Sequence, residues 1–267
     1  MAETKVDGKQ VYYHTGGAEW RSGQPAVLML HGAGFNHVSW HWQARSLAHK
    51  GYSVAVPDLP GRGGSEDIPA ISSIEDYADW CARFLDATGI EAAHVVGHSM
   101  GGAIAVSLAA RHPERVRSLA LIGTGLEIKV NAAFLKDCGE DHPGAVNFIT
   151  ALGFGLPAHL GSSASPGAHL MTAGHHVLES SGSAVMQREF AACARWDGPA
   201  AAPKVRCPAL VLSGAVDRLI PAKLGRALAD AIPGARYEVL PAIGHFLPNE
   251  APRPVIKKLT EFLAAQR

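Results

Sequence analysis

The sequence contains no apolar run that approaches the ~20 residues a membrane-spanning helix needs. Residues 1–7 also lack the apolar core of a signal peptide. Lys and Arg together number 24, and so do Asp and Glu, which leaves a formal net charge of zero. A chain without excess charge has little attraction for nucleic acid or for an anionic membrane, so we expect neither as a partner.

Cysteine is also scarce, and its spacing suggests neither a metal site nor a disulfide framework. We expect reduced, mostly packed thiols in a cytoplasmic protein. Histidine is frequent, with 14 residues, but the adjacent His175 and His176 would point in different directions along a helix. We therefore expect no metal ion and no cofactor. The four cysteines are Cys81, Cys138, Cys193 and Cys207.

Apolar residues make up 47% of the 267 residues and charged residues 18%, enough apolar material for a large buried core. Short apolar strands alternate with helical segments along most of the chain, as is typical of a parallel sheet with helices on both faces. A hairpin over residues 5–15, with Asp7-Gly8 as its turn, precedes them. The expected strands are 26–30, 53–56, 94–96, 117–123, 207–212 and 236–240, and the expected helices are 40–50, 74–88, 102–110, 222–231 and 252–265.

The alternation stops between residues 126 and 202. This region is helix-prone but is interrupted by Gly and Pro, as in residues 153–157 and 161–167. We interpret residues 126–202 as an inserted helical lid. Residues 1–125 and 203–267 would then form one α/β core.

Residues 97–101 read GHSMG and fit the G-x-S-x-G pattern of a nucleophile elbow. An expected strand precedes the motif and a helix of small residues follows it. At such a turn the serine has strained backbone and an exposed hydroxyl, while the flanking glycines permit close contact across the turn. Ser99 is therefore the candidate nucleophile.

A serine nucleophile needs a base, and the base needs a third group to orient it. In open α/β sheets these groups follow the carboxyl ends of strands. Asp217 and His245 both meet that condition, in loops after the strands 207–212 and 236–240. Alone, Asp217 could cap the next helix and His245 could be an ordinary loop histidine. Together they predict a Ser-His-Asp triad.

Two backbone N–H groups are needed to bind a developing oxyanion. Met100, directly after the candidate nucleophile, supplies one. Ala33, in the HGAG loop at residues 31–34, supplies the other, with Gly34 as a close alternative. The candidate pocket residues are Gly34, Trp40, His98, Phe154 and Phe246, although the aromatic ones could equally belong to the core.

A second glycine-rich stretch, DLPGRGGS at residues 58–65, might be mistaken for a phosphate-binding loop. It lacks both the spacing and the Lys-Ser/Thr ending of a P-loop. We interpret it as a turn.

These motifs resemble those of the α/β-hydrolase superfamily. The resemblance covers about residues 25–125 and 203–262. It implies an eight-stranded, mostly parallel sheet with a helical cap, and a triad in which serine attacks an acyl carbon, histidine transfers the proton and aspartate holds the imidazole. Water would then release the acyl group. The segments that carry it are HGAG 31–34, DLPGRGGS 58–65, GHSMGG 97–102, Asp217 with Pro221, and GHF 244–246.

Differences from other branches of the superfamily narrow the resemblance. Haloalkane dehalogenases and epoxide hydrolases carry Asp where this chain has Ser99. Carbon–carbon bond hydrolases of ring-fission products usually have Asn before the nucleophile and Trp after the catalytic His, where this chain has His98 and Phe246. After these differences, the chain still resembles carboxylesterases, enol-lactonases and cofactor-free haloperoxidase-like enzymes, which share a site.

We therefore predict a serine hydrolase acting on a small, largely apolar ester or lactone. The segments expected to form the pocket show no basic cluster for a phosphorylated or polyanionic substrate. Two other hypotheses stay open: a carbon–carbon bond hydrolase of an aromatic degradation pathway, and a low-turnover small-molecule receptor with the same fold. No motif encodes the acyl-chain length, the stereochemistry or the oligomeric state.

Overall fold

The computed structural model describes residues 2–21, 23–163 and 167–266. Its centre is an eight-stranded sheet with the order β1-β2-β4-β3-β5-β6-β7-β8. The six strands from β4 to β8 run parallel, whereas β1 and β2 join the sheet edge as antiparallel strands. The expected eight-stranded, mostly parallel sheet is confirmed. The strands are β1 (Ala2–Val6), β2 (Lys9–His14), β3 (Ala26–Leu30), β4 (Ser53–Pro57), β5 (Ala93–His98), β6 (Val116–Ile122), β7 (Ala209–Gly214) and β8 (Arg236–Leu240).

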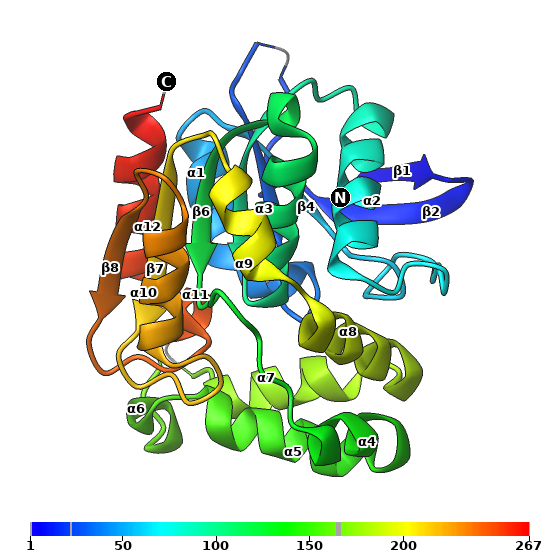
Figure 1. The fold of residues 1–267 in the computed structure, drawn as a ribbon, viewed down its shortest axis with the longest axis vertical. Coiled ribbons are helices and arrows are strands. Elements are labelled where there is room, and N and C mark those ends of the chain that lie inside the picture. Colours follow the sequence, from blue (N-terminus) through cyan, green and yellow to red (C-terminus); the bar gives the residue numbers. More distant parts are fainter. Residues whose placement is uncertain (1, 22, 164–166, 267) are drawn as a thin grey trace.

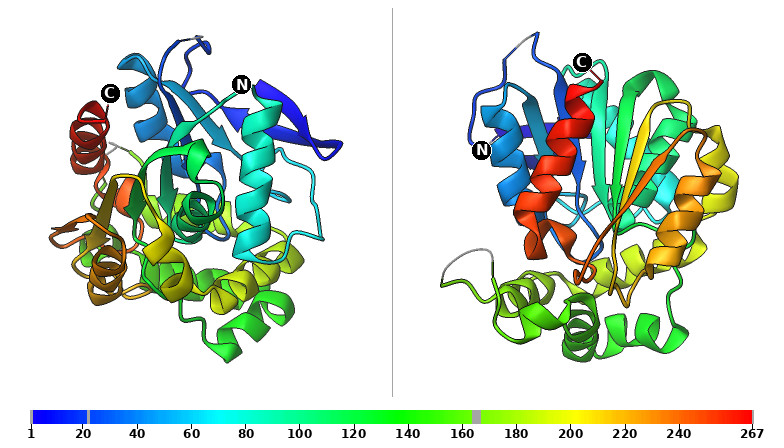
Figure 2. Two further views of the ribbon diagram at one scale, coloured as in Figure 1. Left: turned by 45° about the horizontal axis from the view of Figure 1, so that its top comes forward. Right: turned by 90° about the vertical axis from the view of Figure 1, so that its left-hand side faces the viewer.

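Helices cover both faces of this sheet (Figures 1 and 2). Helices α1 and α12 lie side by side on one face, and α2, α3 and α10 lie on the other. The central strands β3, β4 and β5 are buried along their whole length, which explains their continuous apolar sequence. The bounds are α1 (His41–His49), α2 (Ile74–Ala87), α3 (Met100–Arg111), α10 (Ala222–Ala231) and α12 (Pro252–Ala264).

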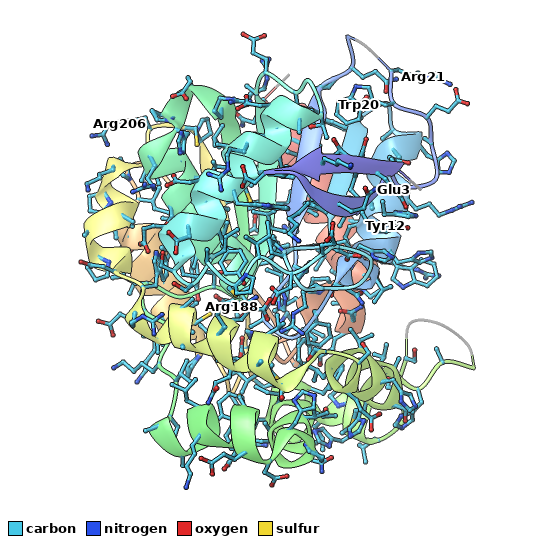
Figure 3. All side chains as sticks on the ribbon, turned by 90° about the vertical axis from the view of Figure 1, so that its right-hand side faces the viewer. Glu3, Tyr12, Trp20, Arg21, Arg188 and Arg206 are labelled. Atoms are coloured by element: carbon cyan, nitrogen blue, oxygen red, sulfur yellow. The ribbon has the colours of Figure 1, made fainter. Side chains whose placement is uncertain are left out.

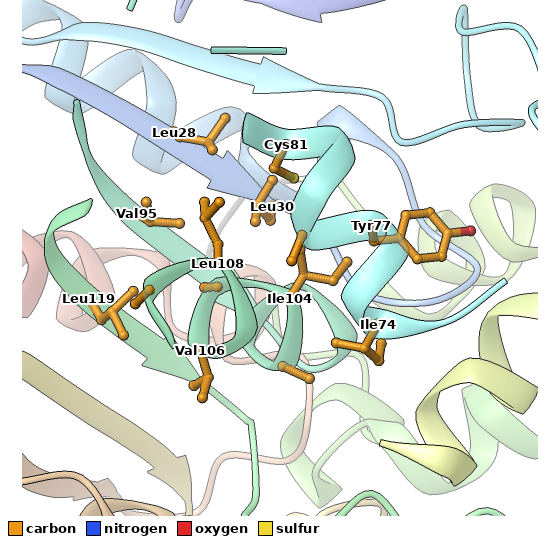
Figure 4. Close-up of a cluster of buried hydrophobic side chains, with 14 of the residues drawn as sticks. Leu28, Leu30, Ile74, Tyr77, Cys81, Val95, Ile104, Val106, Leu108 and Leu119 are labelled. Carbon is orange, nitrogen blue, oxygen red and sulfur yellow. The ribbon is translucent and has the colours of Figure 1, made fainter. Parts of the chain in front are cut away.

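Successive side chains of a strand point to opposite faces of the sheet, so alternate residues of β3 pack in two separate apolar clusters. Leu28 and Leu30 of β3 pack in the cluster beneath α2 and α3, together with Ile104 and Leu108 of α3 (Figure 4). Val27 and Met29 of the same strand pack in the cluster on the face of α1 and α12.

Two local signals set the ends of elements on this scaffold. Asp7 and Gly8 both have positive φ, 53° and 77°, as a tight hairpin turn between β1 and β2 requires. Ser73 and Asp76 form a reciprocal capping box at the start of α2.

Six α-helices lie between β6 and β7 in the described part of the chain, and we call the first five of them, α4–α8, the cap helices. They lie beyond the carboxyl ends of the parallel strands (Figure 1) and have an apolar cluster of their own, which includes Phe134, Ile149, Leu178 and Met186. The cap helices are α4 (Ala132–Glu140), α5 (His142–Gly153), α6 (Leu156–His159), α7 (Leu170–Glu179) and α8 (Ser183–Arg195).

The remaining short elements connect these layers. Helix α9 packs on α3, and Trp196, just before it, donates from its indole Nε1 to Ser107 Oγ of α3 at 3.1 Å. None of the helices in the described ranges combines the length and the apolar character of a membrane span. The short elements are η1 (His37–Trp40), η2 (Pro113–Arg115), α9 (Gly198–Ala201), η3 (Ala202–Lys204) and α11 (Leu247–Glu250).

Candidate active site

Ser99 stands at a strained turn between β5 and α3. Its φ of 54° and ψ of −119° are unusual for a residue with a side chain. A Cβ atom on Gly97 would overlap the carbonyl oxygen of Gly101, and one on Gly101 would overlap the carbonyl oxygen of Leu30. The glycines of the motif therefore let β5, α3 and the end of β3 come together around this one serine.

The loop after β3 carries the predicted second oxyanion donor, and its amides have different partners. The N–H of Gly34 donates to Glu189 Oε2 at 2.8 Å and is therefore engaged within the protein. The N–H groups of Ala33 and Met100 have no recorded acceptor within the described ranges. Of the two candidates for the second donor, the geometry favours Ala33 over Gly34.

His31 connects this loop to the turn after β4. Its Nε2 accepts the N–H of Leu59 at 3.0 Å, so Nδ1 carries the proton of the neutral ring. Burial lowers the pKa of His31 below its ordinary value, because a charged imidazole would lose its hydration. In the neutral ring, Nε2 keeps the lone pair that accepts the N–H of Leu59.

Asp217 and His245 come together at the carboxyl ends of β7 and β8. His245 Nδ1 lies 2.8 Å from Asp217 Oδ2, and the side chains are 5% and 0% exposed. The other oxygen, Asp217 Oδ1, accepts the N–H groups of Leu219 and Ile220. Helix α10 begins later, with Pro221 as its N-cap, so Asp217 does not cap that helix.

Three groups outside the predicted triad hold the backbone around His245 through hydrogen bonds. Its N–H donates to Gly153 O, at the end of α5, at 2.6 Å. Its carbonyl oxygen lies 2.9 Å from His98 Nε2. The carboxylate of Glu250 accepts the N–H groups of Gly244 and Phe246 on either side of it. No sequence motif marks these contacts, and those with Gly153 and His98 join distant parts of the chain.

Ser99 and His245 open into the same cavity, of about 160 Å³. Its wall is mainly apolar and comes from both the sheet side and the cap helices. No Asp or Glu lines it, but two cationic side chains do, Lys129 and Arg218, both exposed. The lining residues are Gly32, Ala33, Phe35, His98, Ser99, Ile128, Lys129, Val130, Asn131, Phe134, Phe148, Ile149, Leu152, Phe190, Arg218, Leu219, Ile220, His245 and Phe246.

The sequence predicts pocket-forming segments without a basic cluster, yet two separate cationic side chains line the cavity. Lys129 precedes α4 and Arg218 follows Asp217, so the two lie 89 positions apart in the sequence. Lys129 Nζ lies 3.6 Å from the exposed Glu127 carboxylate. No ion-pair partner of Arg218 is recorded in the described part of the chain.

Three of the expected pocket residues lie elsewhere. Trp40 is fully buried on the α1 and α12 face of the sheet. Phe154 packs behind Phe246, with ring centroids 4.6 Å apart, in the cluster of the cap helices. Gly34 lies beneath Leu178 of α7. Only His98 and Phe246 of that set line the cavity.

The pair His175 and His176 also differs from expectation. Their ring nitrogens and a carboxylate oxygen of Glu179 all lie within 4.8 Å of one another on α7. The two rings converge on Glu179, which lies one helical turn further on. This cluster does not belong to the cavity wall.

Comparisons with known proteins agree with this geometry. A family model described as alpha/beta hydrolase fold matches residues 25–143. A pimeloyl-[acyl-carrier protein] methyl ester esterase from Chromobacterium violaceum is 31% identical over 256 residues, which cover 91% of this chain and 95% of that protein. The crystal structure of the enol-lactonase from Burkholderia xenovorans LB400 superposes with a TM-score of 0.89 at 26% identity, over 98% of this chain and 100% of that one.

Another relative matches over a shorter range. The dihydrolipoyllysine-residue acetyltransferase component of an acetoin cleaving system from Cupriavidus necator is 42% identical over 132 residues. The match covers 49% of this chain and 34% of that protein. The full-length similarity, the sheet order and the strained serine between β5 and α3 lead to one conclusion: the chain belongs to the α/β-hydrolase fold family.

Proposed function

We propose that this hydrolase cleaves a small carboxylic ester or lactone through an acyl-enzyme on Ser99. The observation that carries the proposal is the bond between His245 Nδ1 and Asp217 Oδ2 at the floor of a cavity that Ser99 also lines. Because Asp217 occupies Nδ1, the other ring nitrogen, Nε2, is left to act as the base. This is the division of roles that a serine nucleophile requires.

In the proposed first step, Ser99 Oγ attacks the carbonyl carbon of the substrate while His245 Nε2 takes the hydroxyl proton. The bond from that carbon to the leaving oxygen then breaks, and the same proton passes from His245 to that oxygen. In the second step water attacks the acyl carbon while His245 Nε2 takes one of its protons. The bond from that carbon to Ser99 Oγ then breaks, the proton passes from His245 to Oγ, and the free acid leaves. A lactone gives a single hydroxy acid by the same steps.

The N–H groups of Ala33 and Met100 would hold the negative oxygen of each tetrahedral intermediate. Loss of one such donor typically costs about 3 kcal/mol of transition-state stabilisation. Ala33 and Ser99 line the same cavity, and Met100 directly follows Ser99 at the start of α3. These positions support a site shared between the ends of β3 and β5.

The cavity wall supports a substrate with an apolar acyl part. Phe134, Phe148 and Leu152 of the cap helices line it, together with Phe246 beside the proposed base. The exposed side chains of Lys129 and Arg218 add positive charge to this wall. We infer that the substrate is largely apolar near Ser99 and tolerates or carries a negative group further out.

We also propose that residues 126–202 act as a lid on a core formed by residues 1–125 and 203–267. The cap helices supply much of the cavity wall, so their packing would set the acyl-chain length. The boundary near residue 202 is the less distinct one, because α9 already packs on α3 of the core.

Steady-state hydrolysis of p-nitrophenyl esters of increasing acyl length tests this function, with Ser99→Ala as the control. We expect turnover with the wild-type protein, an optimum at short acyl chains, and loss of turnover in the folded variant. Turnover that survives in Ser99→Ala would overturn the assignment.

A coloured dienoate ring-fission product, assayed in parallel, separates ester hydrolysis from carbon–carbon bond hydrolysis. Loss of the dienoate colour without release of p-nitrophenol would favour the second activity. Tight ligand binding that raises Tm without release of either product would favour a receptor.

A further inference from the structure

Glu189 of α8 is a fully buried carboxylate that reaches from the cap helices to the loop of the proposed oxyanion hole. Its exposed fraction is 0%. Its Oε2 accepts the N–H of Gly34 at 2.8 Å. Its Oε1 accepts from Arg62 Nε at 3.0 Å, and Arg62 Nη2 donates to Oε2. One side chain thus joins three segments that are distant in the sequence.

Arg62 lies on a turn with little freedom to move. Asp58 Oδ2 accepts the N–H of Gly64 at 2.9 Å, and Ser65 Oγ donates to Asp58 O at 2.7 Å. The same turn bonds to His31 through the N–H of Leu59. The turn therefore holds the guanidinium of Arg62 in a fixed position, where it binds the carboxylate of Glu189.

The ion pair between Arg62 and Glu189 is buried, so both charged groups lose their hydration when the protein folds. Desolvation of two charges often cancels their attraction, so such a pair is weak evidence for stability. Arg62 Nη1 is, in addition, buried and without a partner in the described ranges. A role in the site explains the pair better than a contribution to stability does.

Contacts at Gly34 restrict the loop from two sides. Gly34 has a φ of +81°, and a Cβ atom there would lie 2.5 Å from Leu178 Cδ2 of α7. The bond to Glu189 fixes the orientation of the peptide that links Ala33 to Gly34, because that peptide is planar. The N–H of Ala33 belongs to the preceding peptide of the same short loop, so its direction depends on this restraint.

The positive charge of Arg62 also matters for the proposed reaction, because it neutralises the carboxylate of Glu189. An unpaired carboxylate bonded to the N–H of Gly34, the residue next to the proposed oxyanion donor Ala33, would repel the negative oxygen that forms in the transition state. The two-point contact with Arg62 neutralises Glu189 while leaving Oε2 able to accept from Gly34.

We propose that Glu189 is a positioning residue for the oxyanion hole. It holds the peptide after Ala33 from the cap side, and Arg62 cancels its charge. The inference rests on the proposed function, because it assigns an effect on the Ser99 reaction. It also means that the hole is fully formed only when α8 is seated on the core.

Two double variants test the inference, because both lack the ion pair and they differ only in one acceptor. Arg62→Met with Glu189→Gln keeps an oxygen for the N–H of Gly34. Arg62→Met with Glu189→Leu has none. For each we would measure kcat and KM on a p-nitrophenyl ester, the rate at which a fluorophosphonate labels Ser99, and Tm.

We expect the Gln variant to stay close to the wild-type rates. The Leu variant should lose about 10- to 100-fold in both kcat and labelling rate, with KM unchanged, because a misplaced donor weakens transition-state binding. Arg62→Met alone should be slower than the Gln double variant, since it leaves the carboxylate unpaired. Equal rates in the two folded double variants would overturn the inference.

A neighbouring ion pair provides the matched control. Arg188, also on α8, bonds Asp67 of the same core segment and lies where α8 meets the core (Figure 3). Asp67→Asn with Arg188→Gln should lower Tm and leave kcat unchanged. If this control lowers kcat as far as the Leu variant does, general seating of α8 explains the effect and Glu189 has no special role.

The failure of this inference is distinguishable from failure of the proposed function. Turnover and labelling that persist in Ser99→Ala, or a wild-type protein that reacts with neither reagent, would overturn the proposed function, and the inference would fall with it. If the reaction depends on Ser99 but the two double variants react at equal rates, only the inference is overturned and the proposed function stands.

Discussion

The imidazole of His98 lies 2.9 Å, through Nε2, from the backbone carbonyl oxygen of His245. Because a carbonyl can only accept, Nε2 carries the proton and donates. Burial lowers the pKa of His98 to about 3, so the ring stays neutral near pH 7. The residue that precedes the proposed nucleophile therefore holds the backbone of the proposed base.

Removing this donor should slow the reaction without weakening substrate binding. We expect His98→Leu to lower kcat by about tenfold or more, because small displacements of a catalytic group are costly. His98→Gln offers an amide N–H at a similar reach and should recover most of the rate. Steady-state kinetics on one ester measures both, and equal losses in the two variants would contradict a role for the hydrogen bond.

His98 should also make the stability of the fold depend on pH. The unfolded chain protonates this imidazole near its ordinary pKa of 6.5, whereas the folded chain does so only near 3. The unfolded state thus binds more protons between these values. The contribution of His98 is fully present above pH 6.5 and is lost as the pH falls towards 3. Buried His31, whose pKa is also lowered, acts in the same direction.

Urea unfolding at several pH values between 7.5 and 4.5 measures this effect. The free energy of unfolding should fall less steeply with acidification in His98→Gln, by up to about 1.4 kcal/mol per pH unit for one proton. Parallel curves for wild type and variant would show that His98 is not the titrating group.

Gly101→Ala should damage both the fold and the site. Its Cβ would overlap Leu30 O and lie 2.6 Å from His31 O, and neither backbone atom can move without shifting β3 or the loop of residues 31–34. Overpacking of this kind typically costs about 1–3 kcal/mol. Gly182→Ala is the control, because a Cβ there meets nothing within 4 Å. We expect Gly101→Ala to show a lower Tm and slower ester turnover than the wild type, and Gly182→Ala to match the wild type in both.

The cations of the cavity predict a preference for substrates with a distal negative charge. Lys129→Gln and Arg218→Gln should each raise KM for a p-nitrophenyl half-ester of glutaric acid by about two- to fivefold, as expected of exposed ion pairs. KM for the neutral p-nitrophenyl valerate should not change. Added salt should reduce the difference between the two substrates, and a preference that is insensitive to salt would argue against an ionic origin.

Much of the core could be predicted from sequence because its signals are local. The strands β3, β4 and β6 appear as short apolar runs, and Gly97 and Gly101 mark the turn around Ser99 through the close contacts they permit. The antiparallel edge formed by β1 and β2 was expected as a hairpin, although its pairing with β4 was not.

The walls of the site could not be predicted in the same way. Lys129, Phe148 and Arg218 line one cavity only because the cap helices fold back over the strand ends. Glu189 reaches Gly34 across 155 positions of sequence. Trp40 illustrates the converse error, since its closeness to the oxyanion loop in sequence does not stop its ring from packing on the opposite face of the sheet.

The bond from the N–H of His245 to Gly153 O has a consequence for how new specificities could arise in this protein. The final residue of α5 bonds the backbone of the proposed base, while Phe148, Ile149 and Leu152 of the same helix line the cavity. Side-chain changes at the latter three positions can reshape the pocket without moving His245. An insertion or deletion anywhere in α5 would shift the carbonyl of Gly153 as well. Diversification of this helix should therefore proceed by substitution and tolerate no change in length.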